Sequence, residues 1–310
     1  MFVPMNKRIN GIRRTKERAY AKINLYLDVR GKREDGFHEL CTVMQSVFLA
    51  DDLLITYRPS EKTTLVFSSN LAFLPTDMRN LAVKAAHLYL EKTGICAYVR
   101  IDMKKRIPVA AGLAGGSSDA AAVLRALHRL TGGLLSKEEL LALAADLGSD
   151  VPFCLLGGTR LCLGRGETMT KLSLPAPLYT VVAVDRREHV STPDAFRTLD
   201  DLYRNFDGSV EFPTPSTDIL AAKIEAGKTF DTAVMYNIFE QAVLPCHPHA
   251  TELRERLLTL GAKAAMMSGS GPSVFGVFPD REAAQNAAKI LSDEGFVAHA
   301  AESVLPSKID

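Results

Sequence analysis

One glycine- and serine-rich segment carries the residue types that bind phosphate. It contains, in order, Pro108, Gly112, Leu113, Ala114, Gly115, Gly116, Ser117 and Ser118. Glycines take positive φ readily and let a ligand approach the backbone, and serines cap helices and donate hydroxyls. A helix that starts here would add about half a positive charge facing an anion. We therefore predict a phosphate cradle, although a tight strand-to-helix turn without a ligand would use the same residues.

The sequence on either side of this segment supports that prediction. Residues 98–103 alternate apolar and polar side chains as a strand does. After the segment, apolar residues recur at helical spacing: Ala120, Val123, Leu124, Leu127 and Leu130. Gly132 and Gly133 then stop the helix. The order strand, glycine loop, helix places a helix N-terminus at the loop.

Two well-known phosphate loops do not match this segment. A Walker loop requires Lys and then Ser or Thr after its last glycine, whereas Ser117 follows Gly116 here. A dinucleotide loop requires G-x-G-x-x-G with an acidic residue about twenty positions later, and that spacing is absent. The pattern P-x-x-x-G-L-x-G-G-S-S instead resembles the nucleotide loop of the GHMP kinases, which include galactokinase, homoserine kinase and mevalonate kinase. Ala114 stands where that family usually has glycine.

Two other segments carry groups that phosphoryl transfer needs. Lys22 and Asn24 are two positions apart in a predicted strand over residues 19–30, so they share one face. Outside a site, we expect that face to touch solvent. Asp150 lies between a helix stop at Gly148 and an apolar run, where a carboxylate can be held rigidly. By themselves, these patterns favour a polar sheet face for Lys22 and Asn24 and a turn-forming role for Asp150.

With the glycine loop, four segments bring the resemblance to one branch of the GHMP kinases. They are residues 21–25, 35–40, 148–153 and 268–273. That branch phosphorylates the 2-hydroxyl of 4-diphosphocytidyl-2-C-methyl-D-erythritol in the non-mevalonate route to isoprenoid precursors. The resemblance spans residues 19–303 and implies transfer of the γ-phosphate of ATP to this small cytidine diphosphate substrate. The D-G-F-H sequence at 35–38 discriminates, because other GHMP kinases lack it.

The resemblance also implies roles for individual residues at the reacting groups. Asp150 is the base for the acceptor hydroxyl, Lys22 is its cationic partner, and Asn24 contacts the methylerythritol part. The glycine loop from Pro108 to Ser118 binds ATP, and Asn80 lies near the adenine.

A further group of residues is implied to bind the cytidine. His38 binds the cytosine edge, Phe37 and Phe196 stack on the two faces of the ring, and Thr192 touches the substrate. Stacking a base on an aromatic side chain is worth about 1–3 kcal/mol, so two such faces would select a cytidine nucleotide. The branch often has Tyr at the position of Phe37.

ATP and Mg²⁺ are the implied cofactors. Both nucleotides are polyanions, and Lys22, the helix N-terminus and Mg²⁺ would offset their charge. Ser117 or Ser118 could offer Mg²⁺ a hydroxyl, and we place no other protein ligand for the metal. Residues 104–106 are basic and either assist phosphate binding or form a solvated strand end. Residues 268–273 fit either a hairpin-type turn or a loop that closes on the site.

The order of the predicted elements is mixed, which indicates an α+β fold rather than strict βαβ alternation. Besides the strand over 19–30, we predict strands over 40–48, 52–57, 63–68, 99–103, 160–163, 179–184, 264–268, 273–278 and 297–301. Helices besides the one after the loop are predicted over 81–92, 138–147, 193–204, 216–226, 231–243, 248–260 and 281–293. Residues 205–216 are rich in Pro, Gly and Asp and are predicted as a loop.

Prolines at 175 and 177 mark a predicted domain boundary. We expect an N-terminal ATP-binding GHMP kinase domain over residues 1–175 and a C-terminal GHMP kinase domain over residues 176–310. The resemblance implies a ribosomal-protein-S5-domain-2-like fold for the first domain and a ferredoxin-like α+β fold for the second.

Composition bounds the class of protein. The 310 residues are 47% hydrophobic, enough for one large domain or two ordinary ones. A formal net charge of +1 gives no general attraction to nucleic acid or membranes, and no apolar run approaches the about 18 residues of a membrane span. Residues 1–18 are basic without an apolar core, which predicts a solvated, partly disordered tail rather than a secretory signal. We expect no nucleic-acid or membrane partner, and a monomer or weak homodimer.

The cysteines indicate the compartment. Five cysteines without a C-x-x-C pair predict reduced thiols and a cytoplasmic location. Residues 246–249 hold one Cys and two His, but a proline separates the histidines and no fourth ligand is nearby, so we interpret them as a loop.

Two alternatives to this function remain open. Another GHMP kinase such as homoserine kinase would need no base sandwich, so Phe37, His38 and Phe196 distinguish the two. An RNA-binding protein that uses the ribosomal-protein-like fold would carry a basic face interleaved with aromatics, which the sequence lacks.

Overall fold

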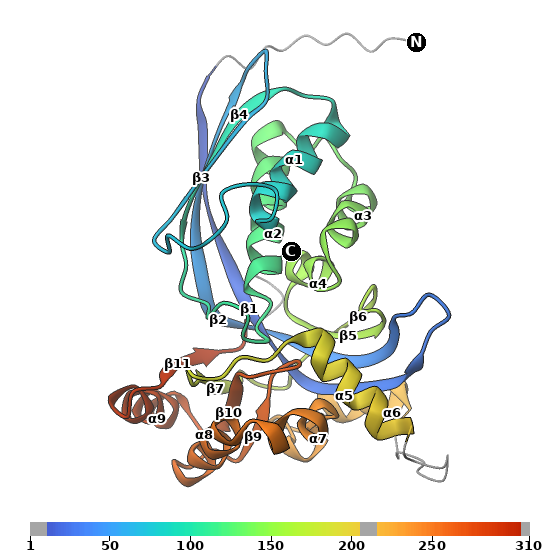
Figure 1. Ribbon diagram of the computed structural model, residues 1–310, viewed down its shortest axis with the longest axis vertical. Coiled ribbons are helices and arrows are strands. Elements are labelled where there is room, and N and C mark those ends of the chain that lie inside the picture. Colours follow the sequence, from blue (N-terminus) through green and yellow to red (C-terminus); the bar gives the residue numbers. More distant parts are fainter. Residues whose placement is uncertain (1–10, 205–215, 305–310) are drawn as a thin grey trace. The chain divides into compact units, whose positions relative to one another are not determined.

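The computed structural model describes residues 11–204 and 216–304 (Figure 1). The chain forms two compact units whose segments alternate along the sequence. Unit 1 contains Met1–Ala19, Asp51–Lys105 and Gly116–Leu155, and unit 2 contains Tyr20–Ala50, Arg106–Gly115 and Leu156–Asp310. Two long strands, β1 (Arg13–Lys32) and β2 (His38–Pro59), therefore contribute residues to both units.

Unit 1 is a sheet with helices on one face (Figure 1). Residues 52–59 of β2 pair antiparallel with β4, and β4 pairs in parallel with β3. Buried residues alternate along β2 (Leu53, Ile55 and Tyr57) and lie opposite buried residues of β4, because successive side chains of a strand point to opposite faces. The remaining elements are β3 (Thr64–Ser69), β4 (Ala97–Lys104), α1 (Leu81–Thr93), α2 (Gly115–Thr131), α3 (Lys137–Leu147) and α4 (Val151–Leu156).

The chain has one seven-stranded and one four-stranded sheet, and unit 2 contains residues of both. In the first, residues 40–45 of β2 pair antiparallel with β5 (Thr159–Gly164), which pairs with β6 (Thr168–Leu172). Residues 26–27 of β1 pair in parallel with β8 (Tyr236–Asn237). The second sheet has the strand order β11-β7-β10-β9, with all neighbours antiparallel. Its strands are β7 (Tyr179–Val184), β9 (Ala264–Met267), β10 (Val274–Phe278) and β11 (Val297–Glu302).

Helices α8 and α9 complete the second sheet of unit 2. Apart from the elements inserted between β7 and α8, the order β7, α8, β9, β10, α9, β11 is the β-α-β-β-α-β arrangement of a ferredoxin-like fold, so that prediction is confirmed. Strand β10 is buried along its whole length, with Val274 in one apolar cluster and Phe275 in another. The helices of this unit are α5 (Thr192–Arg204), α6 (Thr217–Glu225), α7 (Phe239–Val243), α8 (Pro248–Thr259) and α9 (Arg281–Asp293), with short 3₁₀ turns η1 (Thr232–Val234) and η2 (Leu244–Cys246).

The structure corrects several expected boundaries. Strand β1 begins at Arg13, so residues 13–18 are not part of a tail, and residues 1–10 lie outside the described residues. The two strands expected over 40–48 and 52–57 are the single strand β2, because Asp51, which interrupts the apolar pattern, is fully buried against Lys105.

Two further expectations concern unit 2. The helix expected over 231–243 is instead η1, β8 and α7, because Tyr236 and Asn237 pair with β1. Strand β6 was not expected, since most of its residues are polar. Most of the loop predicted over 205–216 lies outside the described residues. Within residues 11–204 and 216–304, no helix is both long and apolar enough to span a bilayer.

Candidate active site

The glycine loop has a left-handed backbone at every second residue. Ala110, Gly112 and Ala114 have φ values of 54°, 74° and 54°. Alternation of left- and right-handed residues is the backbone pattern of anion-binding nests. A left-handed conformation costs a residue with a side chain about 1–2 kcal/mol, which explains why glycine is the favoured residue at the position of Ala114.

Helix α2 begins inside the loop rather than after it. The helix starts at Gly115, so Gly112 has a positive φ whereas Gly115 and Gly116 are helical. Ser117 and Ser118 consequently lie in the first turn of α2 instead of capping it, and Ser118 is buried with 1% of its surface exposed. The first backbone N–H groups of α2 have no partner within the helix, so the loop still leads into an anion-binding helix end.

The serine- and glycine-rich segment at 268–273 packs against the glycine loop within unit 2. Ser268 Oγ donates to the Gly112 carbonyl at 3.2 Å. A Cβ at Gly112 would lie 2.2 Å from the Ser268 carbonyl oxygen, so this contact requires glycine. The Asn237 amide donates to the carbonyls of Met267 and Gly269 at 2.8 and 2.9 Å and holds the segment in place. The segment is the hairpin turn that joins β9 to β10, with the Ser268 N–H donating to the Ser273 carbonyl at 2.9 Å, and the same turn contacts the glycine loop.

Lys22 lies where these two loops meet. Its backbone N–H donates to the Leu113 carbonyl at 3.1 Å, and its Nζ lies 3.2 Å from the position of a Cβ at Gly269. Lys22 and Asn24 are 5% and 3% exposed, so the expectation that their face of the strand touches solvent is wrong. Residues on both faces of β1 are buried here, and the ammonium lies beside the segment at 268–273.

The side chain of Asn24 is held at both ends. Its Oδ1 accepts from Lys22 Nζ at 2.8 Å, and its Nδ2 donates to Thr42 Oγ1 at 2.8 Å. Thr42 Oγ1 in turn donates to the Tyr26 carbonyl at 2.7 Å. This chain of bonds fixes the direction of the amide and points its oxygen at Lys22.

Unit 1 carries Asp150 and Asn80. Asp150 directly precedes α4 and its carbonyl accepts from the Cys154 N–H at 3.0 Å, while the five residues after it are buried and anchor the turn. Asn80 caps α1: its Oδ1 accepts from the Ala82 N–H at 3.0 Å and its Nδ2 donates to the Pro75 carbonyl at 2.9 Å. Both the oxygen and the nitrogen of the Asn80 amide thus have hydrogen-bond partners within unit 1, which gives Asn80 a structural role.

The basic run at 104–106 divides into different roles. In unit 1, Lys105 is buried and its Nζ contacts Asp51 at 2.6 Å and Asp119 at 2.5 Å. Lys104 is exposed. Lys105 contacts two carboxylates and is buried, so it is not a solvated strand end. Burial raises the pKa of Asp119 to about 8, with Lys105 opposing and Asp51 adding to the shift.

Unit 2 brings together most of the residues implied in base binding. The rings of His38 and Phe196 stack with centroids 4.5 Å apart and an interplanar angle of 23°. Phe37 is 48% exposed and its ring lies 3.7 Å from the guanidinium carbon of Arg165. Thr192 Oγ1 lies 2.8 Å from Ser270 Oγ. Phe37 and Phe196 thus contact different partners, and a sandwich around one base stays a prediction.

Several residues at these sites were missed from the sequence. Asp200 accepts from His38, Thr42 holds Asn24, and Asn237 holds the loop at 268–273. Asp200 is four residues after Phe196 on α5, so helical spacing places both on one face and could have indicated it. Nothing in the local pattern around Thr42 or Asn237 indicates its role.

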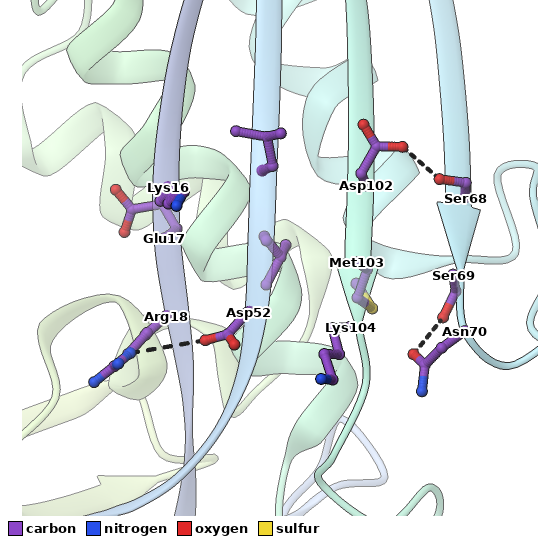
Figure 2. Close-up of a pocket in the computed structure, with 12 residues that line it drawn as sticks. Lys16, Glu17, Arg18, Asp52, Ser68, Ser69, Asn70, Asp102, Met103 and Lys104 are labelled. Carbon is purple, nitrogen blue, oxygen red and sulfur yellow. Dashed lines mark hydrogen bonds and ion pairs between the residues drawn. The ribbon is translucent and has the colours of Figure 1, made fainter.

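Unit 1 contains a cavity of about 790 Å³ that Lys104 lines and that none of the residues predicted to bind ATP or the cytidine substrate lines. Figure 2 shows that its walls come from β1, β2, β3 and β4, on residues such as Arg18, Asp52 and Asp102. Arg18 pairs with Asp52 at 3.7 Å, and Ser68 donates to Asp102. Oppositely charged side chains thus already pair across this polar hollow.

The residues of the glycine loop are suited to binding the phosphates of ATP, whereas the described side chains form no dedicated metal site. Gly112 packs without a Cβ against the loop at 268–273, and helix α2 starts directly after the left-handed Ala114, which suits a phosphate chain. In the parts of the chain that the structure describes, no cluster of three His, Cys, Asp or Glu side chains could hold a metal. Mg²⁺ usually binds through one or two protein ligands plus substrate phosphates, so this donor set is compatible with it.

Comparison with known proteins identifies the family that this chain resembles. Residues 80–158 match the GHMP kinases N terminal domain and residues 222–297 match the GHMP kinases C terminal domain. A protein of Gloeobacter violaceus named 4-diphosphocytidyl-2-C-methyl-D-erythritol kinase is 44% identical over 89% of this chain and 90% of its own. One of Alkaliphilus oremlandii with the same name is 42% identical over 88% of this chain and 90% of its own.

Solved structures agree with these sequence matches. The crystal structure of a 4-(cytidine 5'-diphospho)-2C-methyl-D-erythritol kinase is 36% identical, covers 93% of this chain and 99% of its own, and has a TM-score of 0.76. A homoserine kinase from Cytophaga hutchinsonii has a TM-score of 0.68 over 98% of this chain and 97% of its own, but at 22% identity it shows the fold alone. With both domains matched and relatives above 40% identity over nearly nine-tenths of its length, this chain belongs to the GHMP kinase family.

Proposed function

We propose that this chain transfers the γ-phosphate of ATP to the 2-hydroxyl of 4-diphosphocytidyl-2-C-methyl-D-erythritol. The observation that carries the proposal is the place of Lys22, a buried cation between the glycine loop and the loop at 268–273. Phosphoryl transfer depends mainly on positioning and on charge stabilisation, and a fixed ammonium beside a phosphate loop supplies both. The names of the relatives supply the acceptor.

The glycine loop and the start of α2 would hold ATP. Backbone N–H groups between Pro108 and Ser118 would face the phosphates, where a helix N-terminus favours negative charge. Mg²⁺, when bound with ATP, neutralises part of the phosphate charge. The Ser117 hydroxyl would be its protein ligand, because Ser117 is half-buried in the first turn of α2.

Lys22 and Asp150 would act on the acceptor hydroxyl. Asp150 would accept the proton of that hydroxyl as it attacks, and Lys22 would stabilise the charge that develops on the transferred group. Asn24 would act through Lys22, since it accepts from the ammonium and is itself held by Thr42.

The cytidine would bind at the residues around α5. His38 would read the cytosine edge, and Phe37 and Phe196 would offer aromatic faces to the ring. Thr192 would contact the substrate from the first residue of α5. The same proposal includes a domain boundary near residue 175 and a cytoplasmic location with five reduced thiols. It also includes a monomer or weak homodimer without a nucleic-acid partner.

Phosphorus NMR of the purified protein with ATP, Mg²⁺ and the cytidyl substrate tests the reaction. A new phosphomonoester resonance together with ADP supports the proposal. Intact ATP beside a folded protein contradicts it, and phosphorylation of homoserine in the same assay would favour the alternative kinase.

A matched pair of variants tests the base. Asp150→Asn should lower kcat by about 10²–10⁴-fold with the fold retained, because general-base catalysis contributes that much. Asp146→Asn, an exposed acid four residues earlier, is the control and should leave kcat unchanged. A near-normal kcat for Asp150→Asn would show that Asp150 is not the general base.

A further inference from the structure

The imidazole of His38 is held by a charged pair on its outer side. His38 Nε2 lies 2.7 Å from Asp200 Oδ1, and the other oxygen, Asp200 Oδ2, accepts from Lys32 Nζ at 2.9 Å. Burial alone would raise the pKa of Asp200, but the bonds from His38 and Lys32 outweigh it and lower the pKa below its usual value. Asp200 is therefore a carboxylate at neutral pH.

That carboxylate decides which ring nitrogen carries the proton. An ionised carboxylate only accepts hydrogen bonds, so His38 Nε2 must be the donor. In the neutral imidazole, Nδ1 is then left as an acceptor. Among the residues that the structure describes, none hydrogen-bonds to His38 Nδ1.

The plane of the ring is fixed as well as its tautomer. The rings of Phe196 and His38 stack with centroids 4.5 Å apart, and the rings of Phe196 and Phe239 are nearly perpendicular with centroids 4.8 Å apart. Only 11% of the His38 side chain and 19% of the Asp200 side chain are exposed. A ring held by stacking on one face and by a carboxylate at Nε2 presents Nδ1 in one direction.

We propose that Asp200 is a positioning residue that makes His38 Nδ1 an acceptor and thereby selects cytosine over uracil. The inference rests on the proposed function. Cytosine carries an amino group at C4 that donates a hydrogen bond, whereas uracil carries a carbonyl oxygen there that accepts one. An acceptor at Nδ1 pairs with the amino group and faces the carbonyl oxygen of uracil without a proton between them. Base choice is thus set by a carboxylate that need not touch the base.

Asp200→Asn replaces a carboxylate that only accepts hydrogen bonds with an amide that can also donate one to His38 Nε2. The new amide group can donate to Nε2, which permits the tautomer with the proton on Nδ1. Nδ1 would then donate, which suits the uracil oxygen and not the cytosine amino group. We expect the ratio of kcat/KM for the cytidyl substrate to that for its uridyl analogue to fall by about 10- to 100-fold, the range of one to two hydrogen bonds.

Two readouts separate this role from a structural one. The first is the nitrogen-15 NMR signature of His38, which should show the Nε2–H tautomer in the unmodified protein and lose it in Asp200→Asn. The second is the cytidyl-to-uridyl ratio, because a loosened pocket would lower both values together. Asp194→Asn is the control: it makes the same change on an exposed acid of the same helix, and it should leave the ratio unchanged.

The outcomes distinguish the inference from the function beneath it. No turnover of the cytidyl substrate by the unmodified protein refutes the proposed function. Turnover with an Nδ1–H tautomer in the unmodified protein, or with an unchanged ratio in Asp200→Asn, overturns the role of Asp200. A lost Nε2–H tautomer together with a reduced ratio supports it.

Discussion

Replacing Lys105 with methionine should unfold unit 1 far more easily while keeping the volume of the side chain. Lys105 is 4% exposed and lies between Asp51 and Asp119, which are 0% and 6% exposed. Removing one partner of a buried ion pair costs about 3–5 kcal/mol, because an uncompensated charge stays buried. At about 2–4 °C per kcal/mol, the melting temperature should fall by about 6–20 °C.

The same cluster should also tune ATP binding. Lys105 lies three positions before the first residue of the glycine loop and Asp119 directly follows the loop, so their contact joins the segments on either side of it. We expect Lys105→Met to raise KM for ATP more than KM for the other substrate. The assays are thermal unfolding followed by circular dichroism, and initial rates at varied ATP.

Lys104→Met is the matched control for this experiment. Lys104 is the exposed neighbour, so its loss should shift the melting temperature by no more than a degree or two. A fall of less than about 1 kcal/mol in the free energy of unfolding of Lys105→Met would refute the reasoning, since it would mean that the cluster is solvated.

The cluster also predicts how stability depends on pH. The pKa of Asp119 is raised from 3.8 to about 8 by burial first, so between these values the folded chain holds a proton that the unfolded chain releases. Stability therefore falls as pH rises through this window, and the contribution of this group is fully present only below its unfolded pKa. Asp119→Asn should remove this slope in urea titrations between pH 6 and 8.5. Equal slopes for the two proteins would contradict the assignment.

Three further substitutions test the site. Gly112→Ala should lower the melting temperature and reduce kcat at least 10-fold, because its Cβ would lie 2.2 Å from the Ser268 oxygen at a φ of 74°; normal rates would disprove the close approach. Ala114→Gly should raise the free energy of unfolding by about 0.5–1 kcal/mol, since φ is 54° and glycine avoids that strain; denaturant unfolding measures it, and a loss of stability would contradict it. His38→Ala should raise KM for the cytidyl substrate far more than KM for ATP, and equal effects in steady-state kinetics would remove His38 from the base site.

Local sequence was a good guide to elements whose pattern is strong. The strand, loop and helix around residues 98–131 were predicted, and so were the helices near 81–92 and 281–293, because apolar periodicity and end signals lie within each segment. The break expected between residues 48 and 52 failed because a buried charge looks like a loop residue until its partner is known.

Backbone conformation inside the glycine loop was a second limit. Glycine permits positive φ but does not require it, so residue type alone could not show that Gly112 is left-handed while Gly115 and Gly116 are helical. The left-handed Ala110 and Ala114 go against residue preference and are held by the surrounding structure.

The sequence by itself indicated which residue types could do chemistry: a glycine loop before a helix, a lysine and an aspartate in separate motifs, and an aromatic and histidine pair. Only the tertiary structure decided which of these groups are fixed and by what. Asp200 reaches His38 across 162 positions, and Lys105 reaches Asp51 across 54. Such contacts depend on how strands and helices pack, and packing brings together residues whose local patterns carry no trace of one another.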